Sequence, residues 1–293
     1  MNRTTDSIQE WGGCRLTPAP SSWRFQPGDA IDERAAVHAW TRLGGGRRCE
    51  PWLAWSVEHW SAVAAKCARP ELVEDEPVRR SLAAEAGRAA GLAHPAFQRL
   101  LDDRSGAPRP YILFEYAEGP SLATVRDPRQ LPADDVALIG LQLASALHYL
   151  HRRGFVHLDL KTGNVVLRDG RVVVIDLGLT RPIGCRPGPE GRLNGTRGYL
   201  APEQEAGAPA ATSMDLYALG VVLHELATGQ RPPAEGPPEP STQPMLDACI
   251  KRLLSPDPHC RPHSARELLA ELSPVALAIG AERLWPVWAD RLR

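Results

Sequence analysis

Residues 155–167 read FVHLDLKTGNVVL, and this stretch decides the fold. The polar side chains that interrupt its apolar residues include His157, Asp159, Lys161 and Asn164. The preceding residues 133–152 keep apolar side chains at helical spacing, and NVVL has the composition of a short strand. The spacing therefore predicts that the polar residues lie on a loop between a long helix and a strand, where functional side chains are common.

Four further motifs follow in order along the chain. They are VVVIDLG at 172–178, NGTRGYLAPEQ at 194–204, MDLYALG at 214–220 and DPHCRP at 257–262. Together with the loop they resemble the eukaryotic-like, bacterial-type serine/threonine protein kinases, over roughly residues 33–272. The resemblance implies an α+β, bilobal protein-kinase-like fold, with a small antiparallel β N-lobe carrying one helix (33–116) and a larger, mainly helical C-lobe (117–272).

The resemblance also implies roles for the polar residues. Asp159 would act as catalytic base, and Lys161 would neutralise the transferring group. Asn164 and Asp176 would bind Mg²⁺, with Leu177 standing where the family has phenylalanine. The resemblance gives three more residues structural roles. Arg261 would pair with Glu203, and Asp215 would lie on the helix that anchors the catalytic loop.

The smaller lobe supplies the nucleotide contacts that the resemblance implies. VAAK at 63–66 is similar to the family's β-strand lysine motif, so Lys66 would bind the α and β phosphates of ATP and Glu85 would pair with it. YILFEYAEG at 111–119 resembles the hinge, with Phe114 as gatekeeper. The remaining candidates for ATP contact are Gly44, Gly46, Ala64, Val166 and the backbones of Glu115 and Ala117.

The glycine-rich segment LGGGRRCEPWLAW at 43–55 departs from the family pattern. Cys49 replaces the third glycine and Pro51 replaces the valine that covers adenine. A side chain at the first position and a fixed φ at the second both reduce flexibility. The resemblance therefore leaves the affinity for ATP open.

Three function classes remain after this reading. An ATP-dependent serine/threonine protein kinase is favoured by the ordered motifs, since an isolated Asp or Lys is usually a cap or a solvated surface group. A pseudokinase that regulates a partner is favoured by the altered glycine segment. A small-molecule phosphotransferase shares the HxDxxxxN logic but is disfavoured by the Ala201-Pro202-Glu203 motif.

The sequence predicts no phosphorylation switch in the activation segment. Many relatives carry an arginine before the catalytic aspartate that binds a phosphorylated loop residue. Here Leu158 occupies that position. Between Asp176 and Glu203 the only hydroxyl side chains are Thr180, Thr196 and Tyr199.

Composition bounds the partners and the compartment. The chain has 34 basic and 35 acidic residues among 293, so no long-range field favours nucleic acid. Six scattered cysteines without CxxC spacing and no uninterrupted apolar stretch of about 18 residues predict a reduced, cytoplasmic protein without a membrane span. Protein substrates are implied but not named, and no oligomeric state is indicated.

The regions outside the kinase-like part are less informative. Residues 1–32 are polar and irregular, which predicts a mobile N-terminal extension, and 273–293 are expected to form a C-terminal tail. The Pro-rich stretch at 231–244 predicts a loop. Helices are expected at 78–92, 133–152, 213–228, 244–254 and 264–272, and a strand at 111–116.

Overall fold

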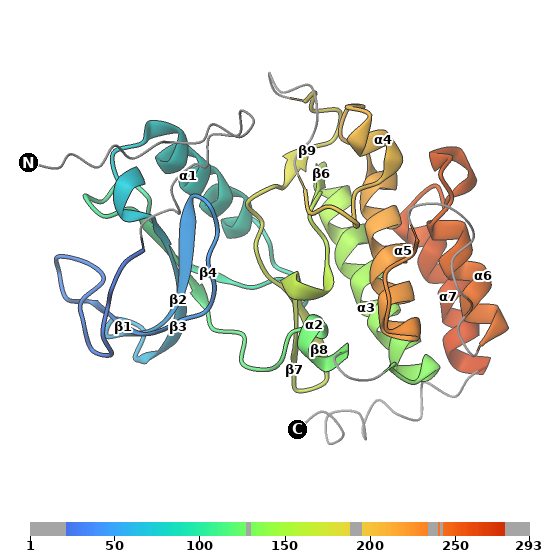
Figure 1. Ribbon diagram of the computed structural model, residues 1–293, viewed down its shortest axis with the longest axis horizontal. Coiled ribbons are helices and arrows are strands. Elements are labelled where there is room, and N and C mark those ends of the chain that lie inside the picture. Colours follow the sequence, from blue (N-terminus) through green and yellow to red (C-terminus); the bar gives the residue numbers. More distant parts are fainter. Residues whose placement is uncertain (1–21, 127–129, 188–194, 234–239, 241–242, 279–293) are drawn as a thin grey trace, which may run out of the picture.

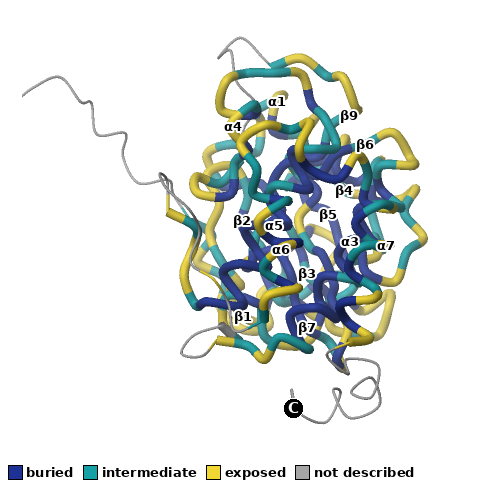
Figure 2. Tube along the Cα trace, turned by 90° about the vertical axis from the view of Figure 1, so that its right-hand side faces the viewer, coloured by how far each residue is buried: buried dark blue, intermediate teal, exposed yellow. Residues whose placement is uncertain are grey.

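The computed structural model describes residues 22–126, 130–187, 195–233, 240 and 243–278. The chain forms two lobes, a β-rich one and a helical one (Figure 1). Buried residues run through the centre of both lobes, and exposed residues follow their outer surface (Figure 2). The expected α+β bilobal fold is confirmed.

The small lobe is an antiparallel five-stranded sheet with one helix. Its strands are β1 (Val37–Arg42), β2 (Cys49–Ser56), β3 (Ser61–Ala68), β4 (Leu100–Arg104) and β5 (Tyr111–Glu115), in the spatial order β1-β2-β3-β5-β4. Successive side chains of a strand point to opposite faces. In β3 this alternation buries Val63, Ala65 and Cys67 in the sheet core and leaves Ala64 and Lys66 on the other face.

Helix α1 (Glu76–Ala90) begins at Asp75, whose carboxylate accepts the Val78 N–H at 2.9 Å. Its buried residues recur at helical spacing: Val78, Leu82, Glu85, Ala86 and Ala89. Glu85 is therefore on the inward face of α1, although the residue type is rarely buried without a partner.

The large lobe is built around a helix that is buried almost all round. The helices are α2 (Leu122–Arg126), α3 (Ala133–Arg152), α4 (Pro202–Glu205), α5 (Thr212–Thr228), α6 (Pro244–Leu253) and α7 (Ala265–Ala278). Helix α5 contacts α3 and α6, and α3 also contacts α7. Gly140 allows this close approach, since a Cβ there would lie 2.8 Å from Leu272 and 3.3 Å from Leu223.

Short elements connect these helices. Two-residue strands β6 (Phe155–Val156) and β9 (Arg181–Pro182) pair with each other, and β7 (Val165–Arg168) forms a hairpin with β8 (Arg171–Val174). Single turns of 3₁₀ helix lie at Pro70–Leu72, Thr162–Asn164 and Pro258–Cys260. The β6–β9 pair and the β7–β8 hairpin bracket the loop that carries Asp159.

Two expected boundaries need correction. Within the expected extension, residues 22–32 pack on the small lobe, because Trp23 and Phe25 join its apolar cluster and Ile31 is fully buried. Residues 1–21 lie outside the described part. At the other end α7 continues past 272 to Ala278, because Val275 and Ala276 are buried against the lobe. Residues 279–293, and most of the Pro-rich stretch, lie outside the described residues.

A buried ion pair joins two distant parts of the large lobe, as the sequence predicted. The Arg261 side chain is fully buried and donates to both carboxylate oxygens of Glu203, at 2.6 and 2.9 Å. Its other N–H groups donate to the Ser213 and Ser255 carbonyls at 2.9 and 2.8 Å. Removing the guanidinium would therefore leave several buried acceptors unpaired.

We expect Arg261→Ala to lower the free energy of unfolding by about 3–5 kcal/mol, because breaking a buried pair leaves a charge without a partner. Urea denaturation of the purified protein measures this. Arg80→Ala is the control, since the Arg80–Glu76 pair on α1 is exposed and should contribute less than about 1 kcal/mol. Equal losses for the two variants would contradict the expectation.

Candidate functional site

A cleft of about 520 Å³ lies between the two lobes. Its walls come from the glycine-rich segment, β3, α1, the β5 end, the β6–β7 loop and the segment after β8. The sequence candidates that line it are Gly46, Ala64, Lys66, Glu85, Ala117, Lys161, Asn164, Val166 and Asp176. Residues far apart in the chain therefore meet at one cavity.

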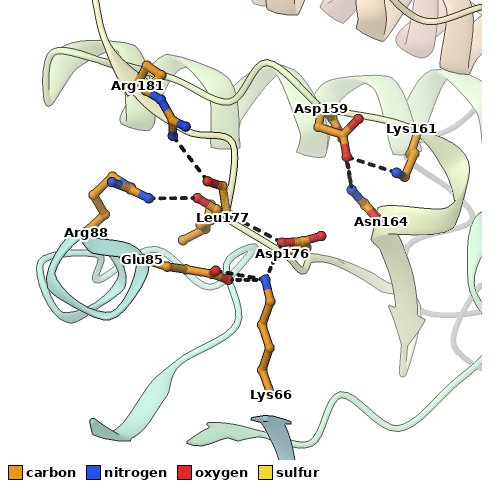
Figure 3. A network of polar contacts seen from close by, with 10 residues as sticks. Lys66, Glu85, Arg88, Asp159, Lys161, Asn164, Asp176, Leu177 and Arg181 are labelled. Atoms are coloured by element: carbon orange, nitrogen blue, oxygen red, sulfur yellow. Dashed lines mark hydrogen bonds and ion pairs between the residues drawn. The ribbon is translucent and has the colours of Figure 1, made fainter. Parts of the chain in front are cut away.

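The Lys66 ammonium is the centre of the cleft's polar network (Figure 3). Its Nζ donates to both carboxylate oxygens of Glu85, each at 2.8 Å, and to Oδ1 of Asp176 at 2.8 Å. The three residues come from β3, α1 and the segment after β8. One side chain thus ties the small lobe's sheet and helix to a segment of the large lobe.

The charges of this cluster depend on one another. Burial lowers the pKa of Lys66, but the Glu85 and Asp176 carboxylates outweigh it and raise that pKa above its ordinary value. For Asp176, burial raises the pKa, while the charge and hydrogen bond of Lys66 outweigh burial and bring the pKa to about 2. For Glu85, burial dominates and raises the pKa despite Lys66.

The Asp159 carboxylate lies across the cleft in a dense set of donors. Lys161 Nζ donates to Oδ2 at 2.9 Å, and Asn164 Nδ2 donates to the same oxygen at 3.1 Å. Thr196 Oγ1 donates to Oδ1 at 2.6 Å and accepts from Lys161 Nζ at 2.7 Å. The Asp159 carboxylate is therefore fixed in orientation by residues on both sides.

Asp215 fixes the backbone of the same loop from below. This fully buried residue of α5 accepts the N–H groups of His157 and Leu158 at 2.8 Å each. Its Oδ2 also accepts from His151 Nε2 at 2.8 Å. Leu158 has φ of +65°, a left-handed conformation that is uncommon for a residue with a side chain. The Asp215 hydrogen bonds compensate for that strain.

Two oxygens could bind a divalent cation. The Nδ2 of Asn164 is used on Asp159, and Oδ1 of Asp176 is used by Lys66 and the Gly178 N–H. Within the described residues this leaves the Asn164 amide oxygen and the second Asp176 oxygen without a protein donor. Oxygen ligands fit Mg²⁺, which usually takes one or two protein carboxylates and completes its shell with phosphates and water.

Three candidates do not line the cleft. Asp159 accepts Asn164 Nδ2 at its carbonyl and at Oδ2, and of the two only Asn164 lines the cavity. Gly44 packs beside Pro51 instead, with Leu43 and Gly45 lining the cavity. The Glu115 N–H pairs with the Arg99 carbonyl at 2.9 Å and its carboxylate pairs with Arg168 at 2.5 Å.

The Glu115 carbonyl is also engaged, since Gln98 Nε2 donates to it at 2.8 Å. A carbonyl oxygen has two lone pairs, so one remains for a ligand. Gln98 itself lines the cleft and was not singled out from the sequence. It lies just before β4, and no local pattern distinguishes it.

Two arginines also escaped the sequence reasoning. Arg88 of α1 donates to the Leu177 carbonyl at 3.4 Å, and Arg181 donates to the Gly178 carbonyl at 3.2 Å (Figure 3). Both therefore contact the backbone directly after Asp176. Arg88 follows Glu85 by one helical turn, but nothing in the sequence shows that the opposite lobe approaches it there.

Comparison with known families is consistent with this geometry. Residues 37–272 match the family described as "Protein kinase domain". The chain belongs to this family. The matched range contains both lobes and every candidate residue of the cleft.

Several bacterial kinases are similar over most of the chain. Serine/threonine-protein kinase PknB of Mycolicibacterium smegmatis is 31% identical over 78% of this chain and 41% of its own length. Serine/threonine-protein kinase PksC of Streptomyces coelicolor is 33% identical over 82% of this chain and 49% of its own length. This kinase-family chain thus spans less than half the length of these curated relatives.

A solved kinase domain shares the fold. The crystal structure of the Mycobacterium tuberculosis PknI kinase domain superposes with a TM-score of 0.64 at 27% identity, covering 82% of this chain and 96% of that one. None of the helices in the described residues of our kinase-family chain has the length and apolar character needed to cross a membrane.

We expect Lys66→Met to make the protein's stability fall more steeply with rising pH than the wild type's does. Without the ammonium, burial would hold the pKa of Glu85 above its ordinary 4.5. A carboxyl group whose folded-state pKa is raised is fully accommodated below its unfolded pKa and destabilises the fold as pH rises through the folded pKa. The melting temperature of the variant should therefore fall, relative to wild type, between about pH 5 and about pH 8.

The double variant Lys66→Met/Glu85→Gln is the control, because the neutral amide cannot ionise. Its melting temperature should lack the additional fall between about pH 5 and about pH 8 that the single variant shows. A single variant whose difference from wild type is the same at both pH values would contradict a buried, unpaired Glu85.

Proposed function

We propose that this domain is an ATP-dependent serine/threonine protein kinase that transfers the γ-phosphate of ATP to a protein Ser or Thr hydroxyl. The observation that carries the proposal is the Lys66 ammonium bonded at once to Glu85 and Asp176 at 2.8 Å. This pairing aligns the phosphate-binding lysine with the proposed metal ligand. Phosphoryl transfer needs such an alignment, because positioning and electrostatic stabilisation supply most of the catalysis.

The apolar side of the cleft suits a nucleotide base. Ala64, Phe114, Ala117 and Val166 line it. We propose that the base lies between Ala64 and Val166, and that the backbone at Ala117 and the remaining lone pair of the Glu115 carbonyl contact it. Gly46 would approach the phosphates beside Lys66, while Gly44 would support the segment.

Asn164 and Asp176 would hold Mg²⁺ through the two oxygens that no described donor uses. When bound, the ion would neutralise phosphate charge and fix the orientation of the transferred group. The Asp176 pKa of about 2 keeps that carboxylate ionised at neutral pH, as a metal ligand requires.

We propose that Asp159 accepts the proton of the substrate hydroxyl as the hydroxyl oxygen bonds to the γ-phosphorus and the bond from that phosphorus to the β–γ bridging oxygen breaks, which releases ADP. The carboxylate would hold the hydroxyl in place, since Lys161, Asn164 and Thr196 fix its own orientation. Lys161 Nζ lies 2.9 Å from Asp159 and lines the cleft, where it would neutralise the group in transfer. The interaction of Lys161 with the group in transfer would strengthen as charge develops in the transition state.

The two rival classes receive less support. A pseudokinase would not need Lys66, Glu85, Asp159, Asn164 and Asp176 in one arrangement, and the relatives are named serine/threonine-protein kinases. A metabolite phosphotransferase is disfavoured by the Glu203–Arg261 pair, which fixes the segment where the family receives protein substrates. The five cysteines in the described residues are free thiols, which fits a proposed location in the cytoplasm.

We expect Asp159→Asn to reduce phosphoryl transfer at least about 100-fold with little change in ATP binding, because the base is lost and the nucleotide contacts remain. Asp176→Ala should abolish the magnesium-dependent reaction. Purified protein is incubated with radiolabelled ATP and a panel of protein and small-molecule acceptors. Full activity of either variant would refute the proposal, and transfer to small molecules alone would favour the metabolite enzyme.

We expect activity without phosphorylation of the activation segment. All three hydroxyl residues are inaccessible or engaged: Thr180 is fully buried, Thr196 bonds Asp159, and Tyr199 bonds Glu225. The buried Leu158 offers no charge to a phosphate. Phosphatase-treated protein should keep its initial rate, and a Leu158→Arg variant should show no new dependence. A large rate loss traced to residues 177–200 would contradict this.

A further inference from the structure

A buried ion pair lies under the glycine-rich segment. Glu50, at the start of β2, has no exposed side-chain surface, and Arg69, just after β3, exposes only 6% of its side chain. Arg69 Nη1 donates to Glu50 Oε1 at 2.7 Å. Such a pair is expensive to desolvate and is weak evidence for stability as such. We therefore looked for a role of the Glu50–Arg69 pair other than stability.

The same guanidinium contacts the glycine-rich segment directly. Arg69 Nε donates to the Gly46 carbonyl at 2.6 Å, and the Arg69 N–H donates to the Arg48 carbonyl at 3.0 Å. Gly46 in turn donates to the Cys49 carbonyl at 3.1 Å. Arg69 therefore forms hydrogen bonds with the turn at 46–49 near both of its ends.

The backbone conformation of Arg69 is itself restricted. Pro70 follows it and disfavours the helical region, and Arg69 is extended, with φ of −64° and ψ of 153°. The guanidinium is planar and presents its donors in a fixed fork. It can therefore serve Gly46 and Glu50 at once, which a lysine ammonium on a flexible stem would do poorly.

The N-terminal segment, residues 22–32, completes the arrangement. The Trp23 N–H donates to Glu50 Oε2 at 3.2 Å, and its indole Nε1 donates to the Ala68 carbonyl at 2.7 Å. Arg109 lies over the Trp23 ring at 4.5 Å. Residues ahead of the first strand thus occupy the second oxygen of the carboxylate that orients Arg69.

We propose that Arg69, oriented by Glu50 and Trp23, is a positioning residue that holds the glycine-rich segment over the phosphates of the nucleotide. Gly45, Gly46 and Cys49 line the cleft that Lys66 also faces. With Cys49 and Pro51 in place, the segment lacks much of the freedom to fold onto a ligand. Arg69 fixes it in place before the ligand arrives, so less ordering entropy is lost on binding.

This inference rests on the proposed function, since it takes the ligand of the cleft to be a nucleotide. The test compares a ligand that has phosphates, which the glycine-rich segment would contact, with one that has none. ADP with Mg²⁺ and adenosine are titrated calorimetrically into the 293-residue chain and its variants. A general loss of fold would weaken the binding of both ligands, whereas a displaced glycine-rich segment would weaken only the binding of ADP.

We expect Arg69→Lys to weaken the binding of ADP at least about 10-fold and that of adenosine less than about 2-fold. Lysine keeps the positive charge but lacks the fork of donors that the guanidinium presents. The KM for ATP should rise while kcat stays within about 3-fold. Trp23→Phe keeps the ring and removes the indole N–H, and it should shift ADP affinity in the same direction by a smaller factor. Arg80→Lys on the exposed face of α1 is the matched control and should change neither ligand.

Equal weakening of ADP and adenosine, or no weakening in Arg69→Lys, would overturn the inference. A wild-type protein that binds ADP but transfers no phosphoryl group would refute the proposed kinase activity and leave this comparison intact. A wild-type protein that binds neither ligand would overturn both.

Discussion

The geometry of the cleft depends most on one ammonium group, that of Lys66. Burial lowers the pKa of Lys66, but the Glu85 and Asp176 carboxylates outweigh it and keep the ammonium charged, and the same ammonium lowers the pKa of Asp176. Because the three residues belong to β3, α1 and the segment after β8, their mutual electrostatics set the relative position of the lobes. Arg88 and Arg181 add to this by holding the backbone that follows Asp176.

In the large lobe, a buried carboxylate orients the loop that carries Asp159. Asp215, on a helix otherwise surrounded by apolar side chains, accepts two backbone N–H groups of the loop that carries Asp159. An acceptor in an apolar interior fixes its donors strongly, because no water competes for them. The loop is therefore oriented by the core of the lobe. Leu158 carries no charge and so cannot orient the loop by binding a phosphate.

The two lobes also differ in how they fix a flexible segment. In the small lobe, Cys49 and Pro51 follow glycines 44–46 and reduce the flexibility of the backbone. Arg69, held by its buried pair with Glu50, bonds the Gly46 carbonyl and fixes the segment. This arrangement extends to Trp23, so residues outside the range that matches the family take part in the small lobe's architecture. On our proposal, the affinity for a nucleotide depends on pre-formed geometry more than on adaptation of the segment.

The sequence by itself determined the fold class, the helices of the large lobe and the candidates Lys66, Asp159, Asn164 and Asp176. It could do so because periodicity is local and because motif order survives without knowledge of contacts. It misjudged residues 22–32 and 273–278, since an irregular or polar stretch reveals its packing only when the surface it covers is known. Only the tertiary structure decided that Gln98, Arg88 and Arg181 belong to the site and that Glu50 and Arg69 form a buried pair, because each depends on contacts between segments distant in sequence.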